Sequence, residues 1–233
     1  MTELHVLRVF TDPAGRHGNP LGVFLDGGAM PAPAERQRVA TELGFSETVF
    51  VDDPARGAIR IFTPGTELEF AGHPTVGCAW LLRAIGAPVE VLRPPAGEVR
   101  VRYDGALTAV TARPEWAPAF NHHELASPEE VDALDGPPGG DEVGAAWAWE
   151  DEAAGRVRSR VFAIAYGIFE DEATGAAAVR LAALLGRPIE IRQGRGSLVA
   201  ARPIGDGYVE VAGRAVLDEV RRYEPAGGDT SSK

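Results

Sequence analysis

The sequence predicts an α+β fold of two pseudo-symmetric domains, each a curved, mostly antiparallel sheet wrapped around one buried central helix. Short segments of alternating apolar and polar residues, punctuated by 28 glycines and 18 prolines, indicate many strands and turns. Residues 72–86 and 173–186 are apolar almost all round, which is typical of buried helices. Several tracts around these two segments repeat at one constant offset, which indicates a duplicated unit.

This internal repeat sets the expected domain boundaries. The repeated tracts are RIF at 60–62 and RVF at 160–162, GAPVEV at 86–91 and GRPIEI at 186–191, and, between them, Leu81 and Leu181. The strand positions that differ exchange valine for isoleucine, so their physical character is kept. We therefore expect two similar domains over residues 1–114 and 115–220, followed by a disordered tail over 221–233.

In the first domain, strands are expected wherever apolar residues alternate or cluster between turn residues. The expected strands are 3–10, 21–26, 46–53, 58–64, 88–93, 98–105 and 107–114. A first helix over 32–44 is indicated by Val39 and Leu43 at helical spacing and by Gly44 at its end. The buried helix 72–86 is the second.

In the second domain, a short acidic helix and a loop are expected over 128–142. Residues 121–124, Asn-His-His-Glu, are interpreted as a loop, because adjacent strand histidines would face opposite sides and form no metal site. The expected strands around helix 173–186 are 145–151, 156–165, 188–194, 197–204 and 208–216.

Composition argues against several classes of function. The 233-residue chain has a formal net charge of −11, which argues against nucleic acid or an anionic membrane as a main partner. No apolar run could span a bilayer and no signal-peptide pattern begins the chain, so we expect a cytoplasmic protein. The single cysteine, Cys78, is interpreted as a core residue, and it permits neither an intramolecular disulfide nor a thiolate metal cluster.

We expect the functional site at the starts of the two buried helices, because each helix follows a polar segment of small residues. Two helix N-termini facing one cleft would hold a carboxylate-bearing small molecule through free N–H groups and the helix dipole. His73, at the first start, is either a structural histidine kept neutral there or a donor or base. Asp171, at the second, either complements the helix dipole or belongs to the site. Gly72 and Gly175 allow close backbone approach.

Glu47 is the third candidate, in the segment TELGFSETVFV at 41–51. Strand alternation would place it on one face with Phe45 and Val49. It points either to solvent from a strand end or into a cleft where desolvation raises its pKa from about 4.3 toward neutral. We expect an enzyme to hold this pKa high for proton transfer, whereas a binding protein has no reason to do so.

Five short motifs occur in order along most of the chain. They are GNPLGV at 18–23, FSETVFV at 45–51, IFTPGTELEFAGHPTVGCA at 61–79, EDEATGAAA at 170–178 and RQG at 192–194. Together they resemble the PhzF-like family of phenazine biosynthesis, within the diaminopimelate epimerase-like superfamily. The resemblance implies the duplicated fold expected above, a homodimer, and an isomerase that uses neither a cofactor nor a metal.

The resemblance also implies roles for individual residues. Glu47 would be the general acid/base that moves a proton between carbons of a small carboxylated substrate, as in the isomerisation of trans-2,3-dihydro-3-hydroxyanthranilate. His73 and Asp171 would be catalytic residues of the same cleft. The matched substrate-binding positions are Asn19, Ser46, Gly72, Thr174, Gly175 and Ala176.

The chain departs from the motifs that it resembles at some of these positions. Glu172 and Ala176 stand where the family signature has proline and serine. The epimerase branch of the superfamily uses two cysteines at the helix starts; Ala71 and the Asp171–Glu172 region lie there in this chain, which excludes two-thiol racemisation. The alternatives to an isomerase are a non-catalytic small-molecule-binding protein with a decayed site, and a related lyase or hydratase using the same glutamate.

Overall fold

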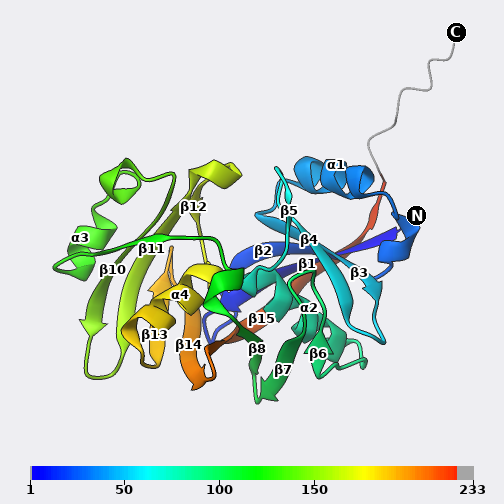
Figure 1. Ribbon diagram of the computed structural model, residues 1–233. Coiled ribbons are helices and arrows are strands. Elements are labelled where there is room, and N and C mark those ends of the chain that lie inside the picture. The colour runs from blue at the N-terminus through cyan, green and yellow to red at the C-terminus, as the bar shows by residue number, and fades with distance from the viewer. Residues whose placement is uncertain (1, 225–233) are drawn as a thin grey trace, which may run out of the picture.

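The structure, a computed structural model, describes residues 2–224 and consists of two lobes side by side (Figure 1). The first lobe contains β1 (Thr2–Thr11), β2 (Asn19–Phe24), β3 (Glu47–Asp53), β4 (Ala58–Phe62), β5 (Glu67–Leu68), β6 (Val91–Leu92), β7 (Val99–Asp104), β8 (Leu107–Ala112), α1 (Pro33–Leu43) and α2 (Gly72–Ala84). The second lobe contains β9 (Asn121–Glu124), β10 (Val143–Asp151), β11 (Arg156–Ala163), β12 (Ile168–Asp171), β13 (Ile189–Gln193), β14 (Ser197–Gly205), α3 (Pro128–Asp132) and α4 (Gly175–Leu185). The last strand, β15 (Tyr208–Tyr223), runs through both.

The strands form one continuous curved sheet, in the order β5-β4-β3-β2-β1-β15-β14-β13-β11-β10-β9. Most neighbours are antiparallel; the parallel pairs in this path are β2–β3, β11–β13 and β9–β10. The expected α+β class is therefore confirmed. The link between the lobes is β15, whose first part pairs with β14 and β8 and whose second part pairs with β1.

The two central helices are buried as expected. Val76, Cys78 and Leu81 of α2 and Val179 and Leu181 of α4 all belong to one hydrophobic cluster that extends through both lobes. In the first lobe α1 covers the other face of the sheet, where a second cluster forms. Each sheet layer thus packs its apolar side chains against a helix, which holds the start of that helix at a fixed place.

The internal repeat corresponds to matching structure. In the first lobe Arg60 on β4 binds Glu67 on β5, and in the second Arg160 on β11 binds Glu170 on β12. In both lobes this strand pair leads directly into the buried helix.

Several expectations about local structure need correction. Residues 121–124 form strand β9 rather than a loop, because they pair in parallel with β10. Residues 221–223 are the end of β15 and not part of a disordered tail, because they pair with β1; residues 225–233 lie outside the described part of the chain. The division into domains 1–114 and 115–220 stays a prediction. Within residues 2–224, no helix is long and apolar enough to cross a membrane.

Candidate active site

The N-termini of α2 and α4 meet at a pair of glycines. A Cβ atom added to Gly72 would lie 2.9 Å from the backbone of Gly175, and one added to Gly175 would lie 2.9 Å from the His73 nitrogen. Only glycine allows this approach, so both helix starts contribute free N–H groups to one place. The convergence expected from the sequence is present in the structure.

Glu47 is brought to these helix starts by β3. It is the first residue of the strand, paired in parallel with Leu21 of β2, and its side chain is 13% exposed. Val49 lies in the core cluster around α2, whereas Phe45 precedes the strand and packs against the opposite cluster near α1. The expected shared face therefore includes Val49 but not Phe45.

His73 is the charge partner of Glu47. Its Nδ1 atom lies 2.9 Å from Glu47 Oε2, and its side chain is 2% exposed. Within residues 2–224, Glu47 Oε2 and His73 Nε2 have no hydrogen-bond partner of good geometry. The charge of His73 lowers the pKa of Glu47 more than the hydrogen bond between the two residues does. Of the two residues, Glu47 lines the pocket described below, so its carboxylate is the group that can meet a ligand.

Because Glu47 and His73 lie next to each other, the pKa of each is shifted in the direction opposite to the one expected from burial. Burial alone would raise the pKa of Glu47, but the neighbouring His73 charge outweighs it and the pKa of Glu47 is lowered. Burial would likewise lower the pKa of His73, but the charges of Glu47 and Asp171 raise it. The pair therefore favours a carboxylate on Glu47 and a protonated imidazole on His73. This is the opposite of the raised Glu47 pKa that we expected of an enzyme and of a neutral His73.

Asp171 is the carboxyl group with the raised pKa. Burial and the nearby Glu47 charge raise its pKa to about 6, although Thr174 and Asn19 oppose this by hydrogen bonding. Thr174 Oγ1 donates to Asp171 Oδ2 at 2.6 Å, and Asn19 Nδ2 donates to Asp171 Oδ1 at 2.6 Å. Ser46 Oγ in turn donates to Asn19 Oδ1 at 3.1 Å. These bonds connect residues of both lobes.

A second connection between the lobes involves Glu172. Its Oε1 accepts a hydrogen bond from Ser197 Oγ at 2.9 Å, and the same Ser197 oxygen accepts the Gly18 N–H at 2.9 Å. Gly18 precedes Asn19, which binds Asp171. The consecutive residues Asp171 and Glu172 therefore hold the consecutive residues Gly18 and Asn19 through a closed ring of contacts.

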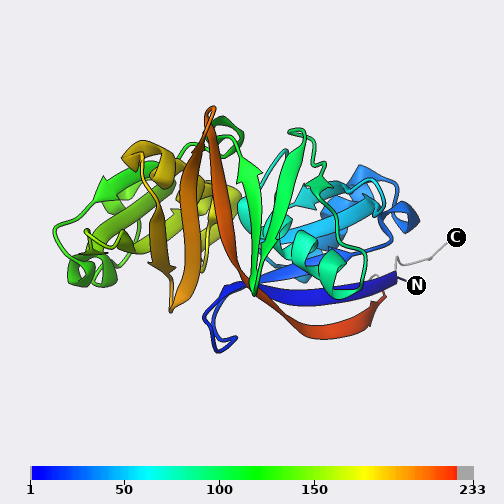
Figure 2. The same cartoon turned by 90° about the horizontal axis from the view of Figure 1, so that it is seen from below.

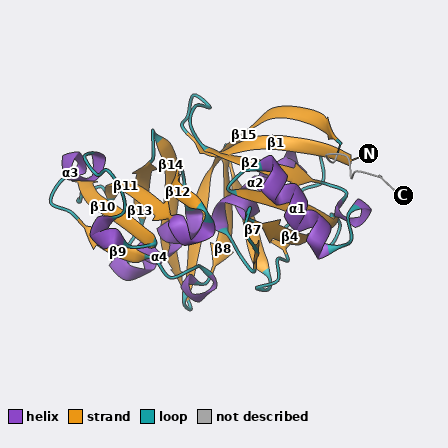
Figure 3. Ribbon diagram, turned by 90° about the horizontal axis from the view of Figure 1, so that it is seen from above, coloured by secondary structure: helices purple, strands orange, loops and turns teal. Residues whose placement is uncertain are grey.

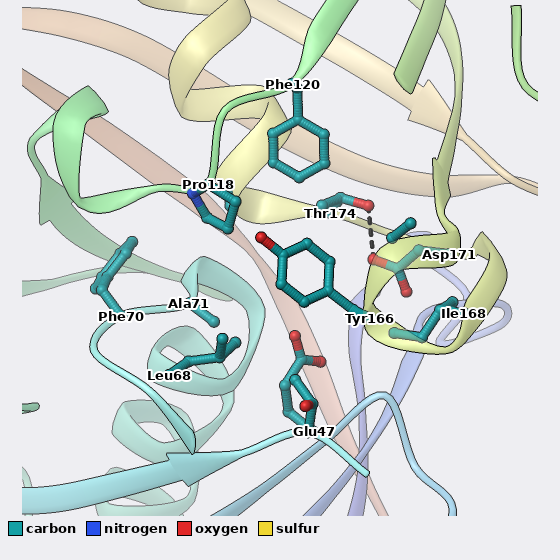
Figure 4. Close-up of a pocket in the computed structure, with 13 residues that line it drawn as sticks. Glu47, Leu68, Phe70, Ala71, Pro118, Phe120, Tyr166, Ile168, Asp171 and Thr174 are labelled. Carbon is teal, nitrogen blue, oxygen red and sulfur yellow. Dashed lines mark hydrogen bonds between the residues drawn. The ribbon is translucent and has the colours of Figure 1, made fainter. Parts of the chain in front are cut away.

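The side chains of Glu47 and Asp171 line a pocket between the lobes, with a cavity volume of about 40 Å³. Figure 4 shows Tyr166 in the middle of this pocket, between Glu47 on one side and Phe120 and Thr174 on the other. Apolar residues, including Leu68, Phe70, Pro118, Phe120 and Ile168, form much of the wall. None of the described residues that line the pocket is lysine or arginine.

All nine candidate residues lie in this region, and their roles stay predictions. Gly72 and Gly175 form the helix contact, Ala176 lines the pocket, and the other six are connected through the contacts given above. Sequence reasoning missed the walls formed by Pro118, Phe120, Tyr166 and Ile168. The only signal in the sequence was the apolar segment around Gly167, just after the expected strand 156–165, and it concerns only Tyr166 and Ile168.

The arrangement can transfer protons on a small anionic molecule. Glu47 is an ionised base, Asp171 can carry a proton near neutral pH, and the helix N-termini and His73 attract negative charge. Cys78 is fully buried and its pKa is raised to about 12, so it supplies no thiolate. Within residues 2–224, no cluster of three or more His, Cys, Asp or Glu side chains could hold a metal ion.

Comparison with known proteins shows which family and which proteins this chain is similar to. Residues 7–137 match the model of the PhzC-PhzF family, described as phenazine biosynthesis-like proteins. The chain is 35% identical to trans-2,3-dihydro-3-hydroxyanthranilate isomerase of Pseudomonas fluorescens over 257 residues, which covers 85% of this chain and 91% of that protein.

Solved structures share the fold. A phenazine biosynthesis PhzC/PhzF protein from Clostridium difficile (strain 630) superposes with a TM-score of 0.76 at 21% identity, covering 96% of this chain and 100% of that chain. A hydroxyproline epimerase from Agrobacterium vitis superposes with a TM-score of 0.61 at 11% identity, covering 94% of this chain and 91% of that chain.

Proposed function

Because this chain belongs to the PhzC-PhzF family of phenazine biosynthesis-like proteins and is an isomerase, we propose that it moves a proton between carbons of a small carboxylated substrate, with Glu47 as general acid/base. The observation that carries this proposal is the ionised Glu47 at the wall of the pocket, within 2.9 Å of His73 and close to a carboxyl group of raised pKa. The P. fluorescens relative suggests trans-2,3-dihydro-3-hydroxyanthranilate or a similar cyclic amino acid as substrate.

The proposed reaction needs only groups of the chain. The substrate carboxylate binds at the N–H groups of α2 and α4 near Gly72 and Gly175. Glu47 removes a proton from one carbon, and the electron pair is delocalised over the conjugated system of the substrate. The Glu47 carboxyl group then returns this proton to another carbon, so the net result is an isomer.

His73 and Asp171 have supporting roles in this proposal. A positive charge on His73 keeps Glu47 ionised before the reaction and attracts the negative charge that develops on the substrate. Protonated Asp171 donates a hydrogen bond to a polar group of the substrate. The apolar walls around Tyr166 and Phe120 exclude water from the transferred proton and fit a flat ring.

The decisive test is solvent deuterium exchange. Wild type, Glu47→Gln and the control Glu69→Gln are incubated in D₂O with trans-2,3-dihydro-3-hydroxyanthranilate and a set of cyclic amino and hydroxy acids, and products are analysed by mass spectrometry. Glu69 is a matched control because it precedes α2 in sequence, as Glu47 does, yet is exposed. We expect deuterium in the product with wild type and Glu69→Gln, and none with Glu47→Gln. Equal exchange by all three proteins would overturn the role of Glu47, and a dehydrated or hydrated product would indicate a lyase or hydratase instead.

A further inference from the structure

The cavity beside Glu47 is too small for the cyclic substrate proposed above. Its volume of about 40 Å³ has room for on the order of three waters, because a cavity needs roughly 10–15 Å³ to hold each water. A ring-bearing amino acid has several times as many non-hydrogen atoms as that. Such a substrate can reach Glu47 only if a side chain leaves the pocket.

Tyr166 is the side chain that occupies the centre of this pocket. Figure 4 shows its ring between Glu47 on one side and Phe120 and Thr174 on the other. Its hydroxyl group is directed away from Asp171. The hydrogen bond marked among the residues drawn joins Thr174 to Asp171, and none of those residues is bonded to Tyr166. Apolar contact with these residues therefore holds the ring, and no hydrogen bond to them has to break when it leaves.

The backbone that carries Tyr166 is a short turn at the surface. Tyr166 is the last residue of η4 (Ile164–Tyr166), and Ile164, Ala165 and Gly167 around it are exposed. The Ala165 N–H donates to the Glu142 carbonyl at 3.2 Å, and the Gly167 N–H donates to the Ile164 carbonyl at 2.9 Å. Gly167 follows with a φ of +80°, a conformation that glycine adopts readily. The neighbours of Tyr166 in sequence are thus outside the core, although its own ring is inside the pocket.

This turn lies on the side of the molecule away from the strands that join the lobes. Seen from below, β14, β15 and the hairpin of β7 and β8 cover the middle of the molecule (Figure 2). Seen from above, β12, which follows the turn, lies near α4 at the junction of the lobes (Figure 3). The side chain of Tyr166 therefore has solvent into which it can move.

We propose that Tyr166 determines the substrate specificity of this chain, because its ring holds the place of the substrate ring in the free protein and moves into solvent when a substrate binds. This inference rests on the proposed function. Moving the ring out of its apolar walls costs free energy, which only a ligand that refills the same space offsets. A flat ring refills it and comes to lie beside Glu47, whereas a linear or very small carboxylate does not. The chain therefore selects ring-bearing carboxylates over linear ones of equal charge.

Fluorine NMR of the chain labelled with 3-fluorotyrosine tests the displacement. The chain has four tyrosines, and the resonance of Tyr166 is the one that is absent from Tyr166→Phe. The ligand is anthranilate, a flat ring carboxylate without a saturated carbon from which a proton could be removed. We expect anthranilate to increase the broadening of the Tyr166 resonance by a soluble gadolinium chelate, because the ring moves into solvent. Acetate, which fits beside the tyrosine, should leave this resonance unchanged. Failure of anthranilate to bind, or better protection of Tyr166 in its presence, would overturn the proposal.

Truncation of the side chain tests its effect on affinity. Tyr166→Ala removes the ring that has to leave, so calorimetry should show a dissociation constant for anthranilate about tenfold lower than in wild type. Tyr166→Phe should bind like wild type, because the hydroxyl contributes no hydrogen bond to the residues around it. The control is Phe169→Ala, since Phe169 is 60% exposed and packs on Phe162 rather than in the pocket. An unchanged dissociation constant in Tyr166→Ala, or an equal gain in Phe169→Ala, would contradict the inference.

These measurements separate the role of Tyr166 from the proposed catalysis. Neither the NMR experiment nor the calorimetry depends on turnover, and anthranilate should displace Tyr166 in Glu47→Gln as it does in wild type. If Tyr166 is displaced but wild type exchanges no proton on any compound, the proposed function fails and the role of Tyr166 is supported. If wild type exchanges protons on a cyclic substrate while Tyr166 stays protected from the chelate, the proposed function is supported and the role of Tyr166 is overturned.

Discussion

His73 Nδ1 lies 2.9 Å from Glu47 Oε2 in a site where both side chains are almost fully enclosed. Neither group would hold its charge alone at this depth, since burial disfavours the charged form of each. Together they favour their charged forms, whereas burial and the nearby Glu47 charge raise the pKa of Asp171, a few residues before α4. The ionisation of the site is therefore a property of three residues from three different elements.

Removing the charge of His73 should shift the pH dependence of the reaction. In His73→Gln the pKa of Glu47 rises, because burial is no longer outweighed by a neighbouring cation. The acidic limb of the kcat/KM profile should move to higher pH, and the rate at neutral pH should fall about 10²-fold or more. A pH–rate profile checks this. If the acidic limb of the profile does not shift in His73→Gln, the pKa that it reflects does not belong to Glu47.

Asp171→Asn should stabilise the protein while impairing its activity. The folded-state pKa of about 6 is above the ordinary value of 3.8, so ionisation of Asp171 costs stability as the pH rises through this range. The variant avoids that cost, and its advantage in unfolding free energy should grow between pH 4 and pH 7, on the order of 2 kcal/mol. Urea denaturation at several pH values measures it; an advantage that is the same at pH 4 and pH 7 would contradict the raised pKa.

The Glu172–Ser197–Gly18 contact should couple the lobes. Glu172→Ala frees the Ser197 hydroxyl, which then holds the Gly18 N–H less firmly. We expect Glu172→Ala and Ser197→Ala to be non-additive by about 1 kcal/mol in a double-mutant cycle. Hydrogen exchange at Gly18 should also be faster in both single variants. Additive effects would show that the two side chains act separately.

The contact between Gly72 and Gly175 should not tolerate a methyl group. Gly175→Ala places a Cβ about 3 Å from both His73 N and Gly72, in backbone that cannot move aside cheaply. We expect a loss of about 2 kcal/mol in stability and a loss of activity, because α2 and His73 are displaced. The control is Gly65→Ala, since Gly65 has no atom within 4 Å of its Cβ position and no positive φ. Thermal unfolding and activity measurements on Gly175→Ala and Gly65→Ala test this prediction.

Local signals were enough to predict the fold class and to single out Glu47, His73 and Asp171, whereas the resemblance to a known family supplied Asn19, Ser46, Thr174 and Ala176. The two apolar helices and the repeat around them specify the architecture, and polar residues at the helix starts mark the site. The ionisation of Glu47 and His73 was predicted in the wrong direction. Each group was considered in its own segment, and the 2.9 Å contact between β3 and α2 that outweighs burial exists only in three dimensions.

The missed elements share a related cause. His122 and His123 were placed in a loop because their spacing suits no metal, but pairing with β10 makes them part of a strand. Tyr166 lines the pocket from a short turn, η4 (Ile164–Tyr166), with no periodic pattern to mark it. Similarly, the end of β15 has too many charged residues to read as a strand, and it is held in place by β1. In each case a partner distant in sequence decides the structure.

The pairing of Thr2 with Tyr223 has a consequence for how the protein is made. A ribosome makes β1 before the other described strands and β15 after them, so β1 waits for all of these strands before both of its edges are paired. Where β15 crosses between the lobes, Gly213 must also accept the ring of Phe10, which packs into the space that a Cβ would need. The first lobe is thus begun before the second but completed after it, and loss of the final ten residues of β15 would damage the lobe whose other strands are made much earlier.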